Sequence, residues 1–303
     1  MKGKKSGRKA IIILAAAITF FAVFAVIFLF EVSANSETVT EFYSKSSFTT
    51  DDESGFSVMT WNIRRTTNAD RGVRSFKKRS GKMVELIKEA DPDIICMQEA
   101  TSSQISFFKK KLHGMSVVYE YRDKTRSPES CPVFYNANRF ELVSSETFWL
   151  SDTPEKMSRT WEADYYRICT AVRLKDKLTG NELAIFNTHI DYKSEDTKLK
   201  SVDLINEKAA DFDCPIVLTG DFNSVPASSA IERTKTYFTE AGEGKPDGDK
   251  ITFNNYLGDR QKKIDYVFYK GNIESLSYSV IDRTYGKIIP SDHYPIKAEF
   301  TYL

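Results

Sequence analysis

The sequence predicts an α/β fold in which two β-sheets pack face to face and helices cover their outer surfaces. Two observations favour a single domain of this fold class. Short apolar or alternating segments bounded by turn residues recur along residues 55–303, and they outnumber the helical patterns. No internal repeat and no Gly/Ser-rich break interrupts that region. Because the chain of 303 residues is 41% hydrophobic and 28% charged, we expect one globular domain over residues 55–303.

The first thirty residues predict a membrane segment. Residues 10–30 are apolar apart from Thr19, and at ~1.5 Å per residue they suffice to cross a bilayer core of roughly 30 Å. Cations crowd residues 1–9, so the positive-inside rule predicts that this basic segment is cytoplasmic. We therefore expect a single-pass protein of the plasma membrane, with residues 55–303 outside the cytoplasm.

A cleaved signal peptide is the alternative for residues 10–30. Val32-Ser33-Ala34 supplies the small residues that signal peptidase requires, and cleavage after Ala34 gives a secreted protein. The apolar stretch is longer than the usual signal-peptide core of ~7 to 15 residues, which favours an uncleaved anchor. Residues 31–54 are rich in Ser, Thr and acids without apolar periodicity, and they predict a linker.

Charge and cysteine usage narrow the classes of partner. The net charge of +1 divides into +4 for residues 1–34 and −3 for residues 35–303. The slightly acidic charge of residues 35–303 argues against tight, sequence-independent coating of DNA.

The cysteines lack C-x-x-C spacing, so we expect free, buried thiols, with two disulfides as the alternative in an oxidising compartment. They are Cys96, Cys131, Cys169 and Cys214.

The predicted elements alternate irregularly along the domain. Apolar periodicity before Asp91-Pro92 and after Ser194-Glu195-Asp196 predicts two helices, and Lys109 to Lys111 stand near another helix end beside His113. Strands are predicted at residues 56–63, 93–97, 115–121, 132–135, 140–150, 166–174, 182–188, 215–219, 264–269 and 295–302.

Several of these strands end in residues suited to metal and phosphate chemistry. Singly, each has a structural explanation as a turn former or a satisfied core residue. Together they predict one pocket, because strand ends are rigid places from which to aim side chains. Two of the three histidines follow this placement, whereas His113 is assigned no role. The strand-end residues are Asn62, Glu99, His189, Asp191, Asp221, Asn223, Asp265, Asp292 and His293.

Six ordered motifs resemble the endonuclease/exonuclease/phosphatase superfamily. The resemblance covers residues 56 to 303 and implies the four-layer α/β sandwich of the pancreatic-type deoxyribonucleases. It also implies divalent-metal-dependent hydrolysis of a phosphate ester by in-line attack of water. Residues 148–154, Trp161 and residues 166–168 further resemble a bacterial branch of the family. The motifs are WNI at 61–63, PDIIxxQE at 92–99, NTHxD at 187–191, GDFNxxP at 220–226, IDY at 264–266 and SDHxP at 291–295.

The oxygen-rich pocket predicts a hard cation. Glu99, assisted by Asn62, is the candidate to hold Mg²⁺ or Mn²⁺, and Asp292 is a further ligand, directly or through water. The resemblance places the metal at the positions of Glu99 and Asn62 as well. Whether one or two ions bind stays open.

The acid–base chemistry is assigned to the remaining strand ends. His293 is predicted as the general base, with Asp265 accepting a hydrogen bond from its other ring nitrogen. The resemblance leaves Asp221 as the alternative base. Asp221 and Asn223 lie on one face of an extended segment and reach the nucleophile and a phosphate oxygen. His189 is predicted to donate to the phosphoryl oxygen, which is worth roughly 2 to 4 kcal/mol in a transition state.

Substrate contacts are predicted outside the strand ends too. Arg167 is a candidate to bind a substrate phosphate, with a surface ion pair as the alternative. Trp149 and Trp161 are candidates for a stacking wall, with core packing as the alternative. A cluster of basic residues follows the first motif. We favour the interpretation that it forms a solvated loop and helix face; contact with a polyanion is the alternative. The cluster comprises Arg64, Arg65, Arg71, Arg74, Lys77, Lys78 and Arg79.

The motifs predict the reaction without fixing the substrate. We expect a monomeric enzyme that hydrolyses a phosphodiester or phosphomonoester of a nucleic acid, nucleotide or lipid headgroup. A nuclease-like phosphodiesterase is favoured. The alternatives are a phospholipase C or sphingomyelinase-type headgroup hydrolase, held to the membrane through residues 10–30, and a catalytically inactive surface binding module.

Overall fold

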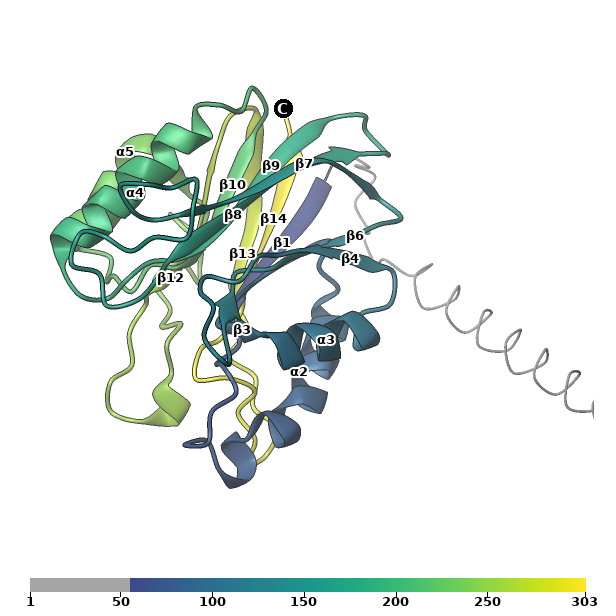
Figure 1. Cartoon of the computed structure of the whole chain (residues 1–303). Helices are drawn as coiled ribbons and strands as arrows, with labels where there is room; N and C mark the ends of the chain where they lie inside the picture. Colours follow the sequence, from purple (N-terminus) through teal and green to yellow (C-terminus); the bar gives the residue numbers. More distant parts are fainter. Residues whose placement is uncertain (1–54) are drawn as a thin grey trace, which may run out of the picture. The chain divides into compact units, whose positions relative to one another are not determined.

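Two six-stranded mixed sheets lie at the centre of the described part of the chain, residues 55–303 of a computed structural model (Figure 1). The first sheet has the order β13 (Ile273–Val280), β14 (Ile296–Tyr302), β1 (Gly55–Asn62), β2 (Ile94–Gln98), β6 (Val133–Asn136), β4 (Met115–Val118). The second has the order β11 (Thr239–Glu240), β12 (Asp265–Lys270), β10 (Ile216–Asp221), β9 (Glu182–His189), β8 (Ile168–Asp176), β7 (Phe140–Trp149). A small ribbon pairs β3 (Ala100–Thr101) with β5 (Glu129–Ser130).

The helices form the two outer layers. On the first sheet lie α2 (Phe76–Ala90) and α3 (Ser102–Lys111), which pack through side chains such as Met83 and Phe108. On the second sheet lie α4 (Glu195–Ala209) and α5 (Ser229–Tyr237), which pack through Ile205 and Ile231. Two 3₁₀ turns, η1 (Gly72–Arg74) and η2 (Asn255–Leu257), lie in connecting loops.

The core between the sheets is apolar on both inner faces. Phe56 and Val58 of β1 meet Val172 of β8 and Val217 of β10, and all are fully buried. Alternation along each strand places the next residues, such as Met59 and Ile216, against the outer helices. The predicted α/β sandwich is thus confirmed, with the order helices, sheet, sheet, helices.

The predicted segments 1–9, 10–30 and 31–54 lie outside the described residues. Within residues 55–303, none of the helices combines the length and the hydropathy that crossing a bilayer requires. All four cysteines are free; Cys96, Cys131 and Cys169 are buried, whereas Cys214 is partly exposed. Burial raises the pKa of the Cys96 and Cys131 thiols to about 12.

The predicted strands all correspond to observed ones. The helix α2 ends at the predicted Asp91-Pro92 stop, and α4 begins at the predicted start beside Ser194. Asp91 caps α2 in a left-handed conformation, and the Ser194 hydroxyl accepts from the Thr197 amide at the start of α4. The short strands β3, β5 and β11 and the longer β13 were not predicted. A register shift between Ser275 and Ser277 interrupts the pairing of β13 at Leu276, which is 51% exposed.

Arg79 corrects the interpretation of the basic cluster as a solvated face. Its guanidinium is fully buried and donates to the carbonyls of Ile63 and Pro290, at 3.1 and 2.5 Å, and to that of Arg64 at 3.2 Å. Buried arginines of this kind replace water for several carbonyls at once. Arg79 therefore joins α2 to the end of β1 and to the segment that precedes Asp292.

Candidate active site

The carboxyl ends of the central strands meet at one edge of the sandwich. The strands β1 and β2 are parallel, with Asn62 opposite Gln98, and β9 and β10 are parallel, with His189 opposite Asp221. Since β12 is antiparallel to β10, it begins at this edge, where Asp265 lies opposite Asp221. The predicted convergence of strand ends is confirmed for both sheets.

Buried hydrogen bonds hold the two sheets together at this edge. Gln98 donates to the side-chain oxygen of Asn187 at 2.7 Å, and the Asn187 amide donates to the carbonyls of Met97 and Pro132 at 2.8 Å each. Asn62 donates to Asp221 Oδ2 at 3.0 Å. These bonds fix the distance between residues that come from different sheets.

Gly220 allows the close approach of β9 and β10 directly before Asp221. Its φ is +150°, and a Cβ at this position would lie 2.0 Å from the Thr188 carbonyl oxygen. No side chain fits there without displacing the backbone of β9. The glycine of the GDFN motif is therefore required by the packing that positions Asp221.

Gly220→Ala is expected to lower the free energy of unfolding by more than about 3 kcal/mol, because the clash is with backbone. Thermal and urea denaturation measure it. The control is Gly81→Ala in α2, where a Cβ meets nothing within 4 Å and a small gain of ~0.5–1 kcal/mol is expected. Equal stability of the two variants would contradict the packing assignment.

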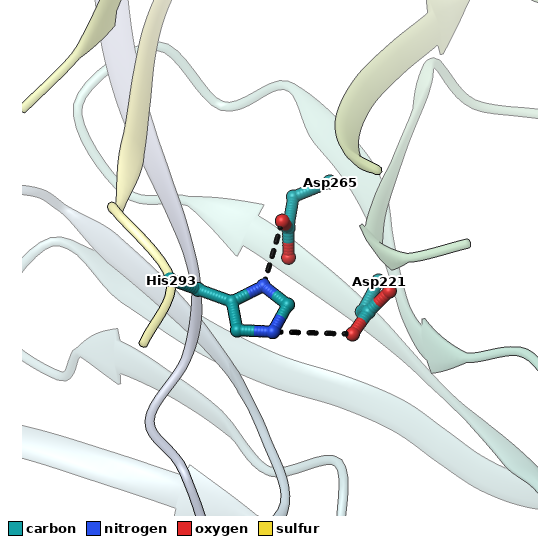
Figure 2. A group of neighbouring side chains, drawn as sticks. All are labelled: Asp221, Asp265 and His293. Atoms are coloured by element: carbon teal, nitrogen blue, oxygen red, sulfur yellow. Dashed lines mark hydrogen bonds and ion pairs between the residues drawn. The ribbon is translucent and has the colours of Figure 1, made fainter. Parts of the chain in front are cut away.

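Asp221, Asp265 and His293 form a buried cluster at the centre of this edge (Figure 2). His293 Nδ1 lies 2.8 Å from Asp265 Oδ2, and His293 Nε2 faces Asp221 Oδ2 at 3.8 Å. Asp265 Oδ2 also accepts from the Thr252 hydroxyl at 2.6 Å. The predicted pairing of Asp265 with His293 is present.

The cluster perturbs the ionisation of its members. Burial alone would lower the pKa of His293, but the carboxylates of Asp265, Asp221 and Asp292 raise it to about 10. Burial and the charge of Asp265 raise the pKa of Asp221 to about 7. His293 is therefore cationic at neutral pH, while Asp221 exchanges its proton close to neutrality.

Glu99 lies beside this cluster in a left-handed conformation, with φ 59°. Its two oxygens accept from the Asn62 side chain at 3.3 Å and from the Arg65 amide at 3.0 Å. Burial would raise the pKa of Glu99, but the Arg65 amide, the charge of His293 and Asn62 together lower it. Asp292 is buried next to Arg64, with 3.3 Å between Oδ2 and the guanidinium.

His189 and Asn223 flank Asp221 on the other side. His189 Nε2 lies 3.1 Å from the Asn223 amide nitrogen and 3.5 Å from Asp221 Oδ2. Burial and the charges of Arg167 and Arg122 hold the pKa of His189 well below its usual value. His189 is therefore neutral and offers one N–H as a donor.

A pocket of about 420 Å³ opens over these residues. Seven of the predicted site residues line it, whereas Asn62 and Asp265 lie behind its wall. The seven are Glu99, Arg167, His189, Asp221, Asn223, Asp292 and His293. The remaining lining residues were not assigned to the pocket from the sequence: Arg64, Arg65, Asp70, Arg74, Arg122, Glu129, Tyr165, Tyr192, Phe253, Asn255, Tyr256, Lys262 and Ile264.

Neither Trp149 nor Trp161 lines the pocket, and the alternative of core packing holds for Trp149. Trp149 is 5% exposed and donates to the Arg122 carbonyl at 2.8 Å, and Trp161 borders a different surface pocket beside Asp152. The aromatic lining comes instead from Tyr165, Tyr192, Phe253 and Tyr256. These residues lie in loops, where no periodicity marks the side that faces a pocket.

Arg167 is buried, not a surface ion-pair partner. It is 6% exposed and lies 3.7 Å from Asp191 Oδ2. Its Nε and one terminal nitrogen have no hydrogen-bond partner among residues 55–303, and neither has Arg122 Nε. Arg122 pairs with Glu129 at 2.7 Å. Two desolvated guanidiniums thus adjoin the pocket, and each has at least one N–H donor without a hydrogen-bond acceptor among the described residues.

The side chains at this edge fit a divalent cation. Glu99, Asp221 and Asp292 supply carboxylate oxygens and Asn62 an amide, the donor set of a hard ion. The buried Asp265 Oδ1 has no hydrogen-bond partner within the described residues. Asp221, Asp265 and His293 form a second donor set, with ligand atoms within 4.8 Å of one another.

Comparison with known proteins settles the family. Residues 59–293 match the model of the endonuclease/exonuclease/phosphatase family. The chain belongs to this family. It is therefore a metal-dependent phosphoester hydrolase, and its buried Asp221, Asp265 and His293 lie where the six motifs converge.

Relatives within the family differ in their named activities. The CCR4-Not complex 3'-5'-exoribonuclease subunit Ccr4 of Aspergillus niger is 23% identical over 317 residues, 76% of this chain and 48% of the relative. The chain spans about half the length of such curated relatives. A family protein of Bacteroides vulgatus superposes with a TM-score of 0.78 at 28% identity, covering 83% of this chain and all of that one. A mannosyl-6-phosphatase of Bacteroides thetaiotaomicron superposes with a TM-score of 0.76 at 27% identity, covering 82% and 100%.

Proposed function

We propose that this protein is a divalent-metal-dependent phosphomonoesterase for a small phosphorylated molecule. The observation that carries the proposal is the buried pair Arg122 and Arg167 beside His189. The sequence favoured a phosphodiesterase and left a phosphomonoester substrate open. Because of the arginine pair, we propose the phosphomonoester instead.

The charge of the substrate explains this preference. A phosphomonoester carries close to two negative charges near neutral pH, with three non-bridging oxygens, whereas a diester carries one charge and two such oxygens. Burial penalises the charge of Arg167, which Glu129, Asp191 and Asp221 offset in part, and Arg122 pairs with Glu129 and Asp123. Arg167 Nε and one of its terminal nitrogens nevertheless have no hydrogen-bond partner among residues 55–303. A dianion at the pocket would supply the missing partners of both guanidiniums.

The size of the pocket supports a small substrate. About 420 Å³ is enough for a phosphate with a sugar-sized group, at the lower end of the usual range of ~300–1,000 Å³ for ligand sites. The mannosyl-6-phosphatase that superposes on this chain over its full length has a substrate of this class by name.

In the mechanism we propose, Asp221 accepts the proton of the attacking water, the alternative that the sequence left open. Cationic His293, oriented by Asp265, faces the charge that develops on the phosphoryl group. Neutral His189 donates to a phosphoryl oxygen, Asn223 orients the His189 ring through its amide, and Arg167 binds another phosphoryl oxygen. Glu99, Asn62 and Asp292 would hold Mg²⁺ or Mn²⁺, which when bound neutralises charge on the phosphate and lowers the pKa of coordinated water.

A nuclease-like phosphodiesterase is the second candidate, because four aromatic side chains line the pocket. The ring centres of Tyr165 and Tyr192 lie 6.1 Å apart, and Phe253 and Tyr256 belong to the same pocket lining. Aromatic side chains of this kind are suited to stacking on a base. The exoribonuclease name of the Aspergillus relative favours this candidate. For either reaction we propose a monomer outside the cytoplasmic membrane, a location inferred from residues 1–30.

The substrate class is tested with two chromogenic esters. Residues 55–303 are expected to hydrolyse p-nitrophenyl phosphate with Mg²⁺, at a kcat/KM at least about tenfold above that for bis-p-nitrophenyl phosphate, and a chelator should abolish both. Faster cleavage of the diester would favour the nuclease. Inert protein with every divalent ion would favour a binding module.

Arg167→Gln is expected to lower kcat/KM for the monoester about a hundredfold and for the diester about tenfold or less, because the second charge loses its partner. Steady-state kinetics on both esters measure the difference. The matched control is Arg173→Gln in β8, the strand that begins directly after Arg167; the Arg173 guanidinium pairs with Glu182 and Asp213 away from the pocket. Equal losses on both esters would show that Arg167 does not distinguish them.

A further inference from the structure

We propose that the mouth of the pocket docks on an anionic lipid bilayer through a surface formed by residues 71–78 and 257–262, the basic rim. Two segments distant in sequence form this surface. The first leads from η1 into α2, and the second lies in the connection between β11 and β12, shortly before β12 begins. Both extend beyond the sheets at the lower end of the molecule in Figure 1.

The basic rim borders the pocket. The Arg74 guanidinium lies 4.8 Å from the centre of the Tyr256 ring, which brings the two segments into contact. Arg74, Tyr256 and Lys262 also line the pocket. A flat surface resting on the rim would therefore lie across the pocket mouth.

The charge of the basic rim suits an anionic surface. Its exposed cations are Arg71, Arg74, Lys77, Lys78, Arg260 and Lys262, and Asp259 is the single exposed acid in the two ranges. The whole chain carries a net charge of only +1, so this end is basic relative to the rest. Clustered cations of this kind bind anionic headgroups with a strength that salt reduces.

Two exposed apolar side chains in the basic rim favour a bilayer over a nucleic acid as its partner. Val73 is 44% exposed and Leu257 is 56% exposed, each among the cations of its own segment. A phosphate backbone offers such side chains no favourable contact, whereas the boundary between headgroups and acyl chains does. Apolar side chains ringed by cations are typical of surfaces that bind at a membrane interface.

The backbone holds Leu257 outward in an unusual conformation. Asn255, Tyr256 and Leu257 are all left-handed, with φ of 48°, 51° and 62°. Backbone hydrogen bonds fix this loop, because the amides of Asn254 and Asn255 both donate to the Asp292 carbonyl, at 2.8 and 3.1 Å. Three successive non-glycine residues in this region are costly and tend to occur where function requires them. If the proposed function also holds, phosphomonoesters carried by headgroups would meet the pocket directly.

Vesicle binding of residues 55–303 tests the proposal. The buried core that lies between the sheets is formed within this fragment, and solved family members align with it over their whole length. We expect it to sediment with vesicles of phosphatidylcholine and about 30% phosphatidylglycerol at least tenfold more tightly than with phosphatidylcholine alone. Lys77→Glu with Lys78→Glu should remove most of this preference, and Val73→Ser with Leu257→Ser should weaken binding several-fold.

A matched variant at the carboxyl end of β8 controls for the changes in charge and hydropathy. Lys175→Glu with Leu178→Ser changes an exposed cation and an exposed leucine away from the rim, and it should bind vesicles like the unchanged fragment. Hydrolysis of p-nitrophenyl phosphate should be equal in all variants, which separates this proposal from the proposed function. Equal binding to both vesicle types overturns the proposal. A second result also overturns it: Val73→Ser with Leu257→Ser leaves vesicle binding intact, and an oligonucleotide displaces the protein from the vesicles. The basic rim would then be a nucleic-acid surface.

Discussion

His293→Ala is expected to lower kcat for p-nitrophenyl phosphate by about a thousandfold or more. The variant removes the cation that faces the developing charge and leaves Asp265 without the partner that lies 2.8 Å away. Steady-state kinetics measure the loss, and calorimetric titration with Mn²⁺ measures cation affinity, which should change little. His113→Ala is the matched control, since His113 is exposed and distant from the pocket lining.

A second substitution separates catalysis from folding. His293→Gln retains a side chain that can pack on Phe253, whose ring centre lies 4.9 Å from that of His293, and it should fold like the unchanged protein. It is nevertheless expected to be nearly inactive, because an amide carries no charge. A folded variant with a rate near that of the unchanged protein would remove His293 from the mechanism.

Glu99→Gln is expected to weaken Mn²⁺ binding and to lower activity together, each by about a hundredfold, because the cation loses a full negative charge. The glutamine keeps the shape of the side chain at a residue whose φ is 59°. Raising the concentration of Mn²⁺ should restore part of the activity. Asn62→Ala should be milder, since an amide contributes no charge to the ion.

The control for Glu99 is Glu129→Gln. Glu129 lines the same pocket, but its carboxylate pairs with Arg65 and Arg122, at 2.6 and 2.7 Å. It should therefore leave cation affinity unchanged. If Glu129→Gln weakened Mn²⁺ binding as much as Glu99→Gln, the cation would have to lie deeper, beside the arginine pair.

The sequence predicted the convergence of the strand ends because it depends on local patterns. Apolar runs that end in Asn62, Asp221 or His189 give both the strand and the side chain that it aims, and parallel pairing brings those ends to one edge. The bonds that join the sheets, such as Gln98 to Asn187, follow from neither pattern. They depend on which side of each strand faces the other sheet.

Residues placed by loops escaped prediction for the same physical reason. Tyr165, Tyr192 and Tyr256 lie in segments without periodicity, so their direction depends on tertiary contacts such as that of Tyr256 with Arg74. The burial of Arg79, in contrast, could have been predicted from the sequence. Arg79 lies one helical turn before Met83, on the buried face of α2, and this spacing predicts burial despite its charge.

The position of the bound cation tests the central claim most directly, namely that Glu99 holds the metal while Asp221 accepts the proton of the attacking water and His293, oriented by Asp265, faces the developing charge. A crystal of residues 55–303 soaked in Mn²⁺ gives that position from the anomalous signal of the ion. We predict a peak in contact with the Glu99 carboxylate, on the side of Asn62, with the Asp265–His293 hydrogen bond intact. A peak inside the cluster of Asp221, Asp265 and His293, with His293 as a ligand, would contradict this assignment.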